Sequence, residues 1–219
     1  MDSVWFTTRG QVVIPAWLRR QFHIEDGTKA VVQATPEGIL LKPITAASIR
    51  RLRGLLKRSR AMNRLIGGGQ TIKLKKRNWR KPNMPAAPAV LDSHALLSLL
   101  RDEPGAEEVE KILTEAGRRD ERAHMTEVNY AEVQYIIRRK DGEAAWQTIA
   151  RELVAAPIQF HVADRVLADR AADFKTRYKI SLADAFAAAL AKTRNAELVT
   201  GDREFKVIES ELKKIRWLK

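Results

Sequence analysis

From residue 89 to the end of the sequence, short apolar runs alternate with longer segments whose apolar residues recur every three to four positions. The short runs predict strands and the periodic segments predict helices. The predicted strands are AVLD, RAHMT, IQFHV, AELVT and IRWL. The predicted helices are SHALLSLL, EEVEKILTEA, EVQYIIRRK, EAAWQTIARELV, ADRVLADRAADFKTRY and LADAFAAALAKT. This alternation predicts an α/β fold, with a parallel sheet covered by helices on both faces.

Residues 1 to 44 follow a different pattern of short pieces. VWFTT and QVVIP read as strands around an Arg9-Gly10 turn, PAWLRRQF as a short helix, and KAVVQA and ILLKP as two more strands. Four strands and one helix of this size bury too little apolar surface to be stable alone, and the chain has no cysteine for disulfides. We therefore expect this part of the chain to dimerise.

Residues 45 to 66, TAASIRRLRGLLKRSRAMNRLI, predict a basic amphipathic helix. Ile49, Leu52 and Leu56 recur at helical spacing with arginines between them, and a break is expected near Gly54. Residues 67 to 88 hold three glycines and three prolines without any period, which is typical of a linker.

The charge of the chain lies almost entirely in its first part. Residues 1 to 91 contain 18 Lys and Arg and 4 Asp and Glu, a net charge of +14, whereas residues 92 to 219 contain 22 and 23, a net charge of −1. Such asymmetry favours a polyanionic partner, either nucleic acid or an acidic surface on a neighbouring segment. A merely solvated basic tail is the simpler alternative.

Composition excludes some classes of site. Without cysteine there are no disulfides and no thiolate zinc sites, and the four histidines are far apart in the sequence, so a histidine-rich metal centre is not expected. The first residues lack the pattern of a secretory leader, and no stretch approaches the roughly 18 apolar residues of a membrane span. We expect a cytoplasmic protein that does not contact a membrane.

Four acidic residues lie at or just after the predicted carboxyl ends of strands, namely Asp92, Glu132, Asp184 and Asp202. In open parallel sheets, sites form at this edge. Carboxylates gathered there would repel one another unless a divalent cation lay between them, and a set of oxygen ligands suits Mg²⁺ or Mn²⁺.

Each acid also has a purely structural explanation. Asp92 has the position of a helix N-cap, and Asp202 that of a turn residue or cap. Asn129 with Glu132, and Ser181 with Asp184, have the spacing of capping boxes. Capping explains each acid singly, whereas their shared edge favours a metal site.

Four ordered motifs, AVLDSHALL, EVNYAEV, SLADAFAAALA and LVTGDREF, resemble those of PIN-domain nucleases, especially the VapC-type toxins of toxin-antitoxin pairs. The resemblance covers about residues 89 to 219. It implies that the four acids bind Mg²⁺ or Mn²⁺, that Thr200 orients water or metal ligands, and that Glu204 is an auxiliary acid. It also implies metal-dependent hydrolysis of single-stranded RNA.

The segment TTRGQVVIPAWLRRQFHIEDGTKAVVQATPEGILLKP resembles the AbrB/MazE-like, or SpoVT-AbrB, DNA-binding domain over about residues 3 to 44. That family folds as an intertwined dimer of swapped hairpins. The resemblance implies a homodimer that binds a palindromic operator, with Arg9, Arg19 and Arg20 as candidate DNA contacts. For Arg19 and Arg20, a solvated helix face or ion pairs with the nearby turn acids is the alternative.

Residues 46 to 66 resemble the tail of VapB-type antitoxins, which packs an apolar stripe on the toxin and inserts a basic side chain among the toxin's acids. The candidates for that inserted side chain are Arg53, Lys57, Arg58 and Arg60. A guanidinium can bridge carboxylates and displace a metal. After Ile66 the sequence departs from the antitoxin pattern, since GGGQTIKLKK replaces the charged, acid-containing helix.

Together these observations predict four segments: a DNA-binding dimerisation domain at 1–45, a basic tail at 46–66, a linker at 67–88 and a PIN nuclease domain at 89–219. The favoured hypothesis is a fused toxin-antitoxin chain, in which a self-repressing DNA-binding front end restrains a metal-dependent endoribonuclease. The alternative is a non-enzymatic AbrB-type transcriptional regulator whose PIN-like half is a blocked scaffold.

Overall fold

The structure, a computed structural model, describes residues 4–57, 88–119 and 121–219. Its larger sheet has five parallel strands in the order β5-β4-β3-β6-β7. The strands are β3 (Ala89–Leu91), β4 (Ala123–Thr126), β5 (Ile158–His161), β6 (Glu197–Thr200) and β7 (Ile215–Trp217). Chain order reverses between β3 and β6, so this doubly wound sheet has its switch point there.

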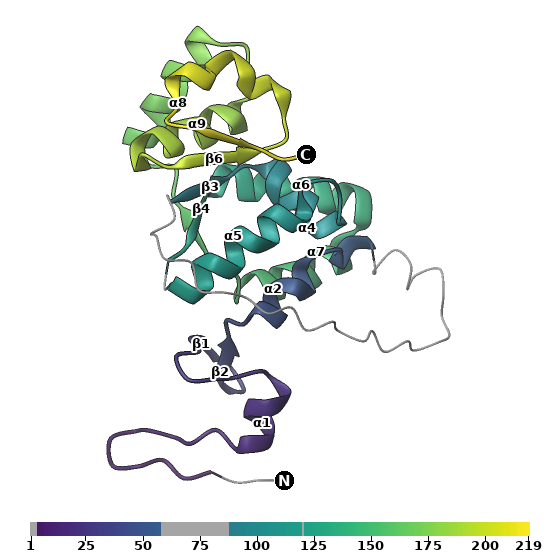
Figure 1. Ribbon diagram of the computed structural model, residues 1–219, viewed down its shortest axis with the longest axis vertical. Coiled ribbons are helices and arrows are strands. Elements are labelled where there is room, and N and C mark those ends of the chain that lie inside the picture. Colours follow the sequence, from purple (N-terminus) through teal and green to yellow (C-terminus); the bar gives the residue numbers. More distant parts are fainter. Residues whose placement is uncertain (1–3, 58–87, 120) are drawn as a thin grey trace.

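Helices cover both faces of this sheet, as the sequence predicts (Figure 1). They are α4 (Ser93–Arg101), α5 (Ala106–Arg119), α6 (Glu127–Asp141), α7 (Glu143–Leu153), α8 (Arg165–Arg177), α9 (Leu182–Arg194) and the 3₁₀ helix η1 (Arg203–Glu211). Val90 packs in the apolar cluster of α8 and α9, whereas its neighbour Leu91 packs in the cluster of α4 and α5. Successive strand residues face opposite sides, so an uninterrupted apolar run suits a strand buried on both faces. The predicted α/β fold is confirmed.

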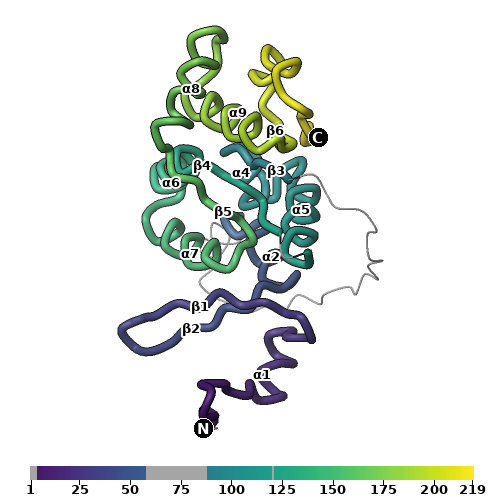
Figure 2. The backbone as a smooth tube through the Cα atoms, turned by 90° about the vertical axis from the view of Figure 1, so that its left-hand side faces the viewer, coloured from purple at the N-terminus to yellow at the C-terminus, as the bar shows by residue number. Residues whose placement is uncertain are grey.

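The N-terminal part extends away from the C-terminal domain (Figures 1 and 2). It contains α1 (Ala16–Gln21) and an antiparallel hairpin of β1 (Ala30–Thr35) and β2 (Gly38–Pro43). The two strands predicted before α1 are reduced to a single bridge between Phe6 and Val12. A two-stranded hairpin is marginal unless its face packs on something, and here Trp5 is 89% exposed and Val13 76% exposed.

Residues 46–57 of the basic segment form part of the C-terminal domain's core, and residues 58–66 lie outside the described residues. Helix α2 (Ala46–Leu52) begins at a capping box between Thr45 and Ser48 and ends before Gly54, which adopts a φ of +66°. The predicted break at Gly54 is therefore confirmed. Ile49, Leu52 and Leu56 are 2%, 1% and 1% exposed and join the apolar cluster of α5 and α7. Of the predicted linker at 67–88, residues 67–87 lie outside the described residues.

Within the described ranges, every helix is too short or too polar to cross a lipid bilayer.

Candidate active site

Asp92 directly follows β3 and caps helix α4. Its Oδ1 accepts a hydrogen bond from the Ala95 amide at 2.7 Å, and its Oδ2 accepts one from the Thr200 hydroxyl at 2.5 Å. Thr200 is the last residue of β6, so this bond joins the two strands that flank the switch point. The side chain is 1% exposed, and a carboxylate in such a place must be neutralised by protonation or by a bound cation.

Burial raises the pKa of Asp92 to about 7. The hydrogen bonds from Thr200 and Ala95 oppose this rise, whereas the negative charges of Asp184 and Asp202 add to it. The three carboxylates are therefore near enough to interact electrostatically. A cation that binds among them would offset both the cost of burying their charges and their mutual repulsion.

Asp184 reaches the same edge of the sheet from the first turn of α9. Its amide donates to the Ser181 hydroxyl at 3.0 Å, and its Oδ2 accepts a hydrogen bond from the Ser181 amide at 3.2 Å. The predicted capping box is confirmed. Burial raises the pKa of Asp184, and the charge of Asp202 raises it further.

Glu132 lies in the second turn of α6, which begins at the cap Thr126. The expected capping box between Asn129 and Glu132 is wrong, because the Thr126 hydroxyl accepts from the Asn129 amide at 3.0 Å. Burial raises the pKa of Glu132, and the charges of Asp184 and Asp202 add to the rise, while a hydrogen bond with Ser93 lowers it. Glu132 therefore shares the electrostatic environment of the other acids.

Asp202 follows β6 and caps the 3₁₀ helix η1. Its Oδ1 accepts a hydrogen bond from the Glu204 amide at 2.9 Å, and its own amide donates to the Thr200 hydroxyl at 2.9 Å. Glu204 is exposed in the first turn of η1. Asp92 and Asp202 are thus N-caps, and Asp184 is the third helical residue of a capping box. The structural explanation therefore holds for three of the four acids, which still share one edge of the sheet.

A buried network that the sequence analysis did not single out holds three of these helices together. Asn129 is fully buried, and its Nδ2 donates to the Ser93 hydroxyl at 3.2 Å and to the Ala183 carbonyl at 3.1 Å. Its Oδ1 accepts from the Thr126 hydroxyl at 2.5 Å. Asn129 thereby ties α6 to the helix starts that carry Asp92 and Asp184. In the sequence, Asn129 was noted only as part of the motif EVNYAEV and as a possible capping-box partner of Glu132.

His94 also borders the acids. Its exposed ring lies so close to Gly201 that a Cβ placed there would be 2.4 Å from the His94 Cε1 atom. Ser98, one turn along α4, is 3.3 Å from the His94 Nδ1 atom. Gly201 stands between Thr200 and Asp202, so its lack of a side chain allows the ring to lie beside the site.

The donor set suits a hard divalent cation, because it consists of carboxylate oxygens. Within the described residues, however, no three or more of the acidic or histidine side chains lie close enough to hold a metal ion. The acids are electrostatically coupled without forming a closed ligand cage. Binding of Mg²⁺ or Mn²⁺ by Asp92, Glu132, Asp184 and Asp202 would therefore require their side chains to draw together.

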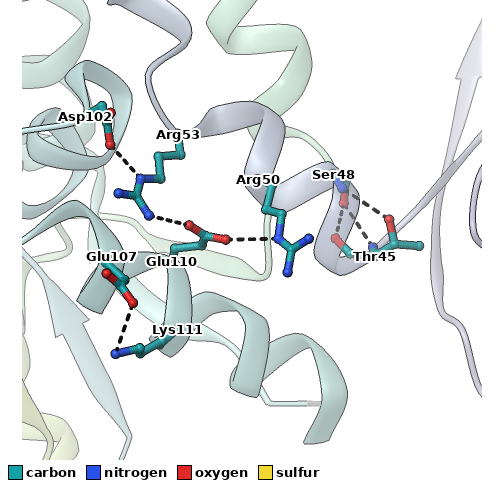
Figure 3. A network of polar contacts seen from close by, with 8 residues as sticks. All are labelled: Thr45, Ser48, Arg50, Arg53, Asp102, Glu107, Glu110 and Lys111. Carbon is teal, nitrogen blue, oxygen red and sulfur yellow. Dashed lines mark hydrogen bonds and ion pairs between the residues drawn. The ribbon is translucent and has the colours of Figure 1, made fainter. Parts of the chain in front are cut away.

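The described part of the basic segment, residues 46–57, lies at the other end of α4 from Asp92. Figure 3 shows Arg53 between Asp102 and Glu110, with Arg50 on the other side of Glu110. Arg53 Nε is 2.6 Å from Asp102 Oδ1 and Arg53 Nη1 is 3.0 Å from Glu110 Oε2; these bonds raise the pKa of Arg53. Lys57 Nζ lies 4.0 Å from Asp102.

Asp102 caps the carboxyl end of α4, whereas Asp92 caps its amino end. The expectation that Arg53 or Lys57 lies among the four acids is therefore wrong in this structure. Long basic side chains pair with the nearest acids, and Asp102 and Glu110 lie beside the docked helix. The remaining candidates, Arg58 and Arg60, lie outside the described residues.

The candidate DNA contacts are exposed. Arg9 stands in a turn that Gly10 closes with a φ of +71°, and Arg19 and Arg20 form the last turn of α1. In the part of the chain that the structure describes, neither Arg19 nor Arg20 pairs with the turn acids Glu25 and Asp26. Their role in DNA binding stays a prediction.

Two histidines far apart in the sequence meet on neighbouring strands. His124 Nδ1 lies 3.0 Å from His161 Nε2, and Arg194 Nη2 lies 3.3 Å from His161 Nδ1. Burial lowers the pKa of His124 to about 4, and the nearby His161 and Arg194 add to that effect. Neutral rings share this hydrogen bond, and the pair binds β4 to β5.

The geometry defines a doubly wound α/β domain with an acidic site at its switch point. Residues 89–211 match the family described as PIN domain, which is more than half of the chain. The chain therefore belongs to the PIN-domain family. The match does not extend into the first 88 residues, so their resemblance to an AbrB-like domain stays a prediction.

No curated protein matches the chain. Among solved structures, it is similar to VapBC2 from Rickettsia felis bound to a promoter DNA fragment, with 16% identity, a TM-score of 0.49, and coverage of 60% of this chain and 98% of that one. DNA-bound VapBC from Salmonella typhimurium has 14% identity and a TM-score of 0.47, with 59% and 97% covered. VapC20 from Mycobacterium tuberculosis, a sarcin-ricin loop cleaving toxin, has 14% identity and a TM-score of 0.44, with 54% and 93% covered.

Proposed function

We propose that this chain is a fused toxin-antitoxin protein of the cytoplasm. Its C-terminal PIN domain is a Mg²⁺- or Mn²⁺-dependent endoribonuclease. Its N-terminal part is a dimeric DNA-binding domain that represses its own operon through Arg9, Arg19 and Arg20. The segment at 46–66 restrains the nuclease, and Arg58 and Arg60 are its candidates for contact with the acids.

The observation that carries this proposal is the electrostatic coupling of four carboxylates at the switch point of a PIN domain. Burial raises the pKa values of Asp92, Glu132 and Asp184. The negative charge of Asp202 raises all three further. A fold gains nothing in stability from carboxylates that repel one another in a buried place. Such an arrangement is typical of a functional site that awaits a cation.

A divalent cation at this place would acidify a water molecule and stabilise charge on the leaving oxygen of a phosphodiester. The chain's own groups position the ligands. Thr200 and the Ala95 amide fix both oxygens of Asp92, Ser181 fixes Asp184, and the Glu204 amide fixes Asp202. The Ser93 and Asn129 network holds the start of α4 against α6, which carries Glu132.

One observation favours a second function. In the described residues the acids do not form a closed ligand cage, which is what a non-enzymatic regulator with a PIN-like scaffold would show. That alternative predicts salt-sensitive DNA binding and no RNA cleavage under any metal condition.

The test is cleavage of a single-stranded RNA by the whole chain with Mn²⁺, with Mg²⁺, and with a chelator. We expect metal-dependent cleavage that falls at least 100-fold in Asp92→Asn and in Asp184→Asn, because each removes a ligand charge. Asp169→Asn, an exposed acid on α8, is the matched control and should leave cleavage unchanged. Equal cleavage by all four proteins would show a contaminating nuclease and contradict the proposal.

The restraint is tested with the double variant Arg58→Ala/Arg60→Ala. Its cleavage should exceed that of the unchanged chain if these side chains reach the acids. Equal cleavage would show that Arg58 and Arg60 do not restrain the nuclease, and would contradict this part of the proposal.

A further inference from the structure

A cavity of about 430 Å³ opens at the carboxyl ends of β6 and β7. Gly201 lines it, and the same residue separates Thr200 from Asp202. Trp217, Arg203 and Lys206 also line it. Its volume is within the roughly 300–1,000 Å³ of typical small-ligand sites. The cavity therefore lies on the same edge of the sheet as the candidate active site and adjoins it.

The charges of this cavity are opposite to those of the acids. Arg203 and Lys206 are exposed on η1, and among the described residues neither makes an ion pair or a side-chain hydrogen bond. The acid of this wall, Glu209, is engaged, because it accepts a hydrogen bond from the Trp217 indole at 3.0 Å. The cations are thus available to a ligand, and their field favours a phosphate.

An aromatic ring is held in the same wall. Trp217 is half-buried against the cluster of α8, α9 and η1, and its bond to Glu209 fixes the ring's orientation. A fixed ring beside unpaired cations is the combination that binds single-stranded nucleic acid, since the base stacks on the ring and the cations contact the backbone.

We propose that this cavity is a subsite for one nucleotide of a single-stranded RNA. This nucleotide lies next to the phosphodiester that is cleaved at the acids. Trp217 stacks the base, and Arg203 and Lys206 bind the adjoining phosphate. The proposal rests on the proposed function for its choice of RNA. It also answers a difficulty of that function, because a polyanion that approaches four carboxylates needs nearby cations to offset the repulsion.

The test uses the full chain, a chelator, and a short single-stranded RNA that carries a photoreactive uridine. After irradiation, adducts are mapped by mass spectrometry, so that binding by the basic front end is separated from binding at this site. We expect adducts within residues 203–219. Their yield should fall about tenfold in Arg203→Ala/Lys206→Ala and in Trp217→Ala, and remain in Trp217→Phe, which keeps a stacking ring.

Arg139→Ala/Lys140→Ala is the matched control, because it removes two exposed cations from the far end of α6 and should leave the yield unchanged. The thermal midpoints of all variants show whether they fold. If Trp217→Ala does not fold, Arg203→Ala/Lys206→Ala still decides the test. Adducts confined to the first 88 residues would overturn the subsite. So would an undiminished yield in Arg203→Ala/Lys206→Ala, or competition by duplex RNA as strong as by a single strand.

Because this experiment needs neither metal nor cleavage, its result is independent of the nuclease test. Adducts without RNA cleavage would support the subsite and contradict the proposed nuclease. RNA cleavage with an unchanged KM in Arg203→Ala/Lys206→Ala would support the nuclease and contradict the subsite.

Discussion

Asp92 combines two roles that local sequence patterns treat as alternatives. It caps α4 through the Ala95 amide, and it is a buried acid whose pKa is raised to about 7. Because the folded state holds its proton more tightly than the unfolded chain, the stability that Asp92 contributes is complete below the ordinary pKa near 4. This stability is lost as the pH rises through about 7.

Replacement Asp92→Asn should therefore stabilise the metal-free chain at pH 8, by an amount on the order of 2 kcal/mol, and less at pH 5. Asparagine keeps the cap and carries no charge. Chemical denaturation at the two pH values measures the difference. A variant that is less stable than the unchanged chain at pH 8 would show that burial of the carboxylate is not costly.

At the residue scale, the sequence was enough to predict the acids and two of the residues that hold them, Ser181 and Thr200, but not the contacts between distant segments. Asp92, Asp184 and Asp202 follow strands or begin helices, and such places can be read from the local pattern. The contacts of Asn129 with Ser93 and of His94 with Gly201 join segments far apart along the chain. No local pattern contains that information.

At the element scale, α2 is held to the C-terminal domain by apolar burial and by paired charges. Leu52 is 1% exposed, and Glu110 on α5 accepts from both Arg50 and Arg53. The Gly54 amide adds a hydrogen bond to the Leu99 carbonyl at 2.9 Å. The net positive charge of this segment is thus matched in part by acids of the chain's own C-terminal domain. The charge asymmetry of the sequence favoured either nucleic acid or such an acidic surface as the partner.

Replacement Leu52→Ala should reduce the free energy of unfolding by about 2–4 kcal/mol, because it leaves a cavity between α2 and α5. Glu110→Gln should cost about 1 kcal/mol, since its partners are partly exposed. Glu107→Gln is the matched control on the same helix, where the pair with Lys111 is exposed, and should change stability by less than about 0.5 kcal/mol. Urea titration measures all three, and equal effects from Glu107→Gln and Glu110→Gln would mean that α2 is not docked in solution.

Most elements of the C-terminal domain could be predicted from the sequence because their periods are regular. The 3₁₀ helix η1 could not, since the segment from Arg203 to Glu211 has neither a clear strand nor a clear helix period. The strands predicted at 4–8 and 11–15 shrink to one bridge. The apolar pattern of these two segments predicted burial, but within the described residues side chains such as Trp5 and Val13 remain exposed.

At the scale of the whole molecule, this unburied surface favours a second copy as the partner of the N-terminal part. Apolar side chains such as Trp5 and Val13 stay largely exposed in the single chain. Monomeric proteins rarely leave large apolar surfaces open to water. Homodimerisation through this part therefore remains our prediction.

Light scattering after size-exclusion chromatography should give the mass of two chains for the unchanged protein. Val13→Asp should give the mass of one chain, because a charge in the dimer interface costs several kcal/mol. Val207→Asp, which changes a comparably exposed valine on η1, should leave the dimer intact. A monomeric unchanged protein would contradict the prediction.

The central claim is that Asp92, Glu132, Asp184 and Asp202 together hold a divalent cation. Titration of the whole chain with Mn²⁺ in a calorimeter tests it without any need for catalysis. We expect saturable binding that is lost in Asp92→Asn and in Asp184→Asn and kept in Asp169→Asn. Binding that is absent from the unchanged chain, or equal in all four proteins, would contradict the account.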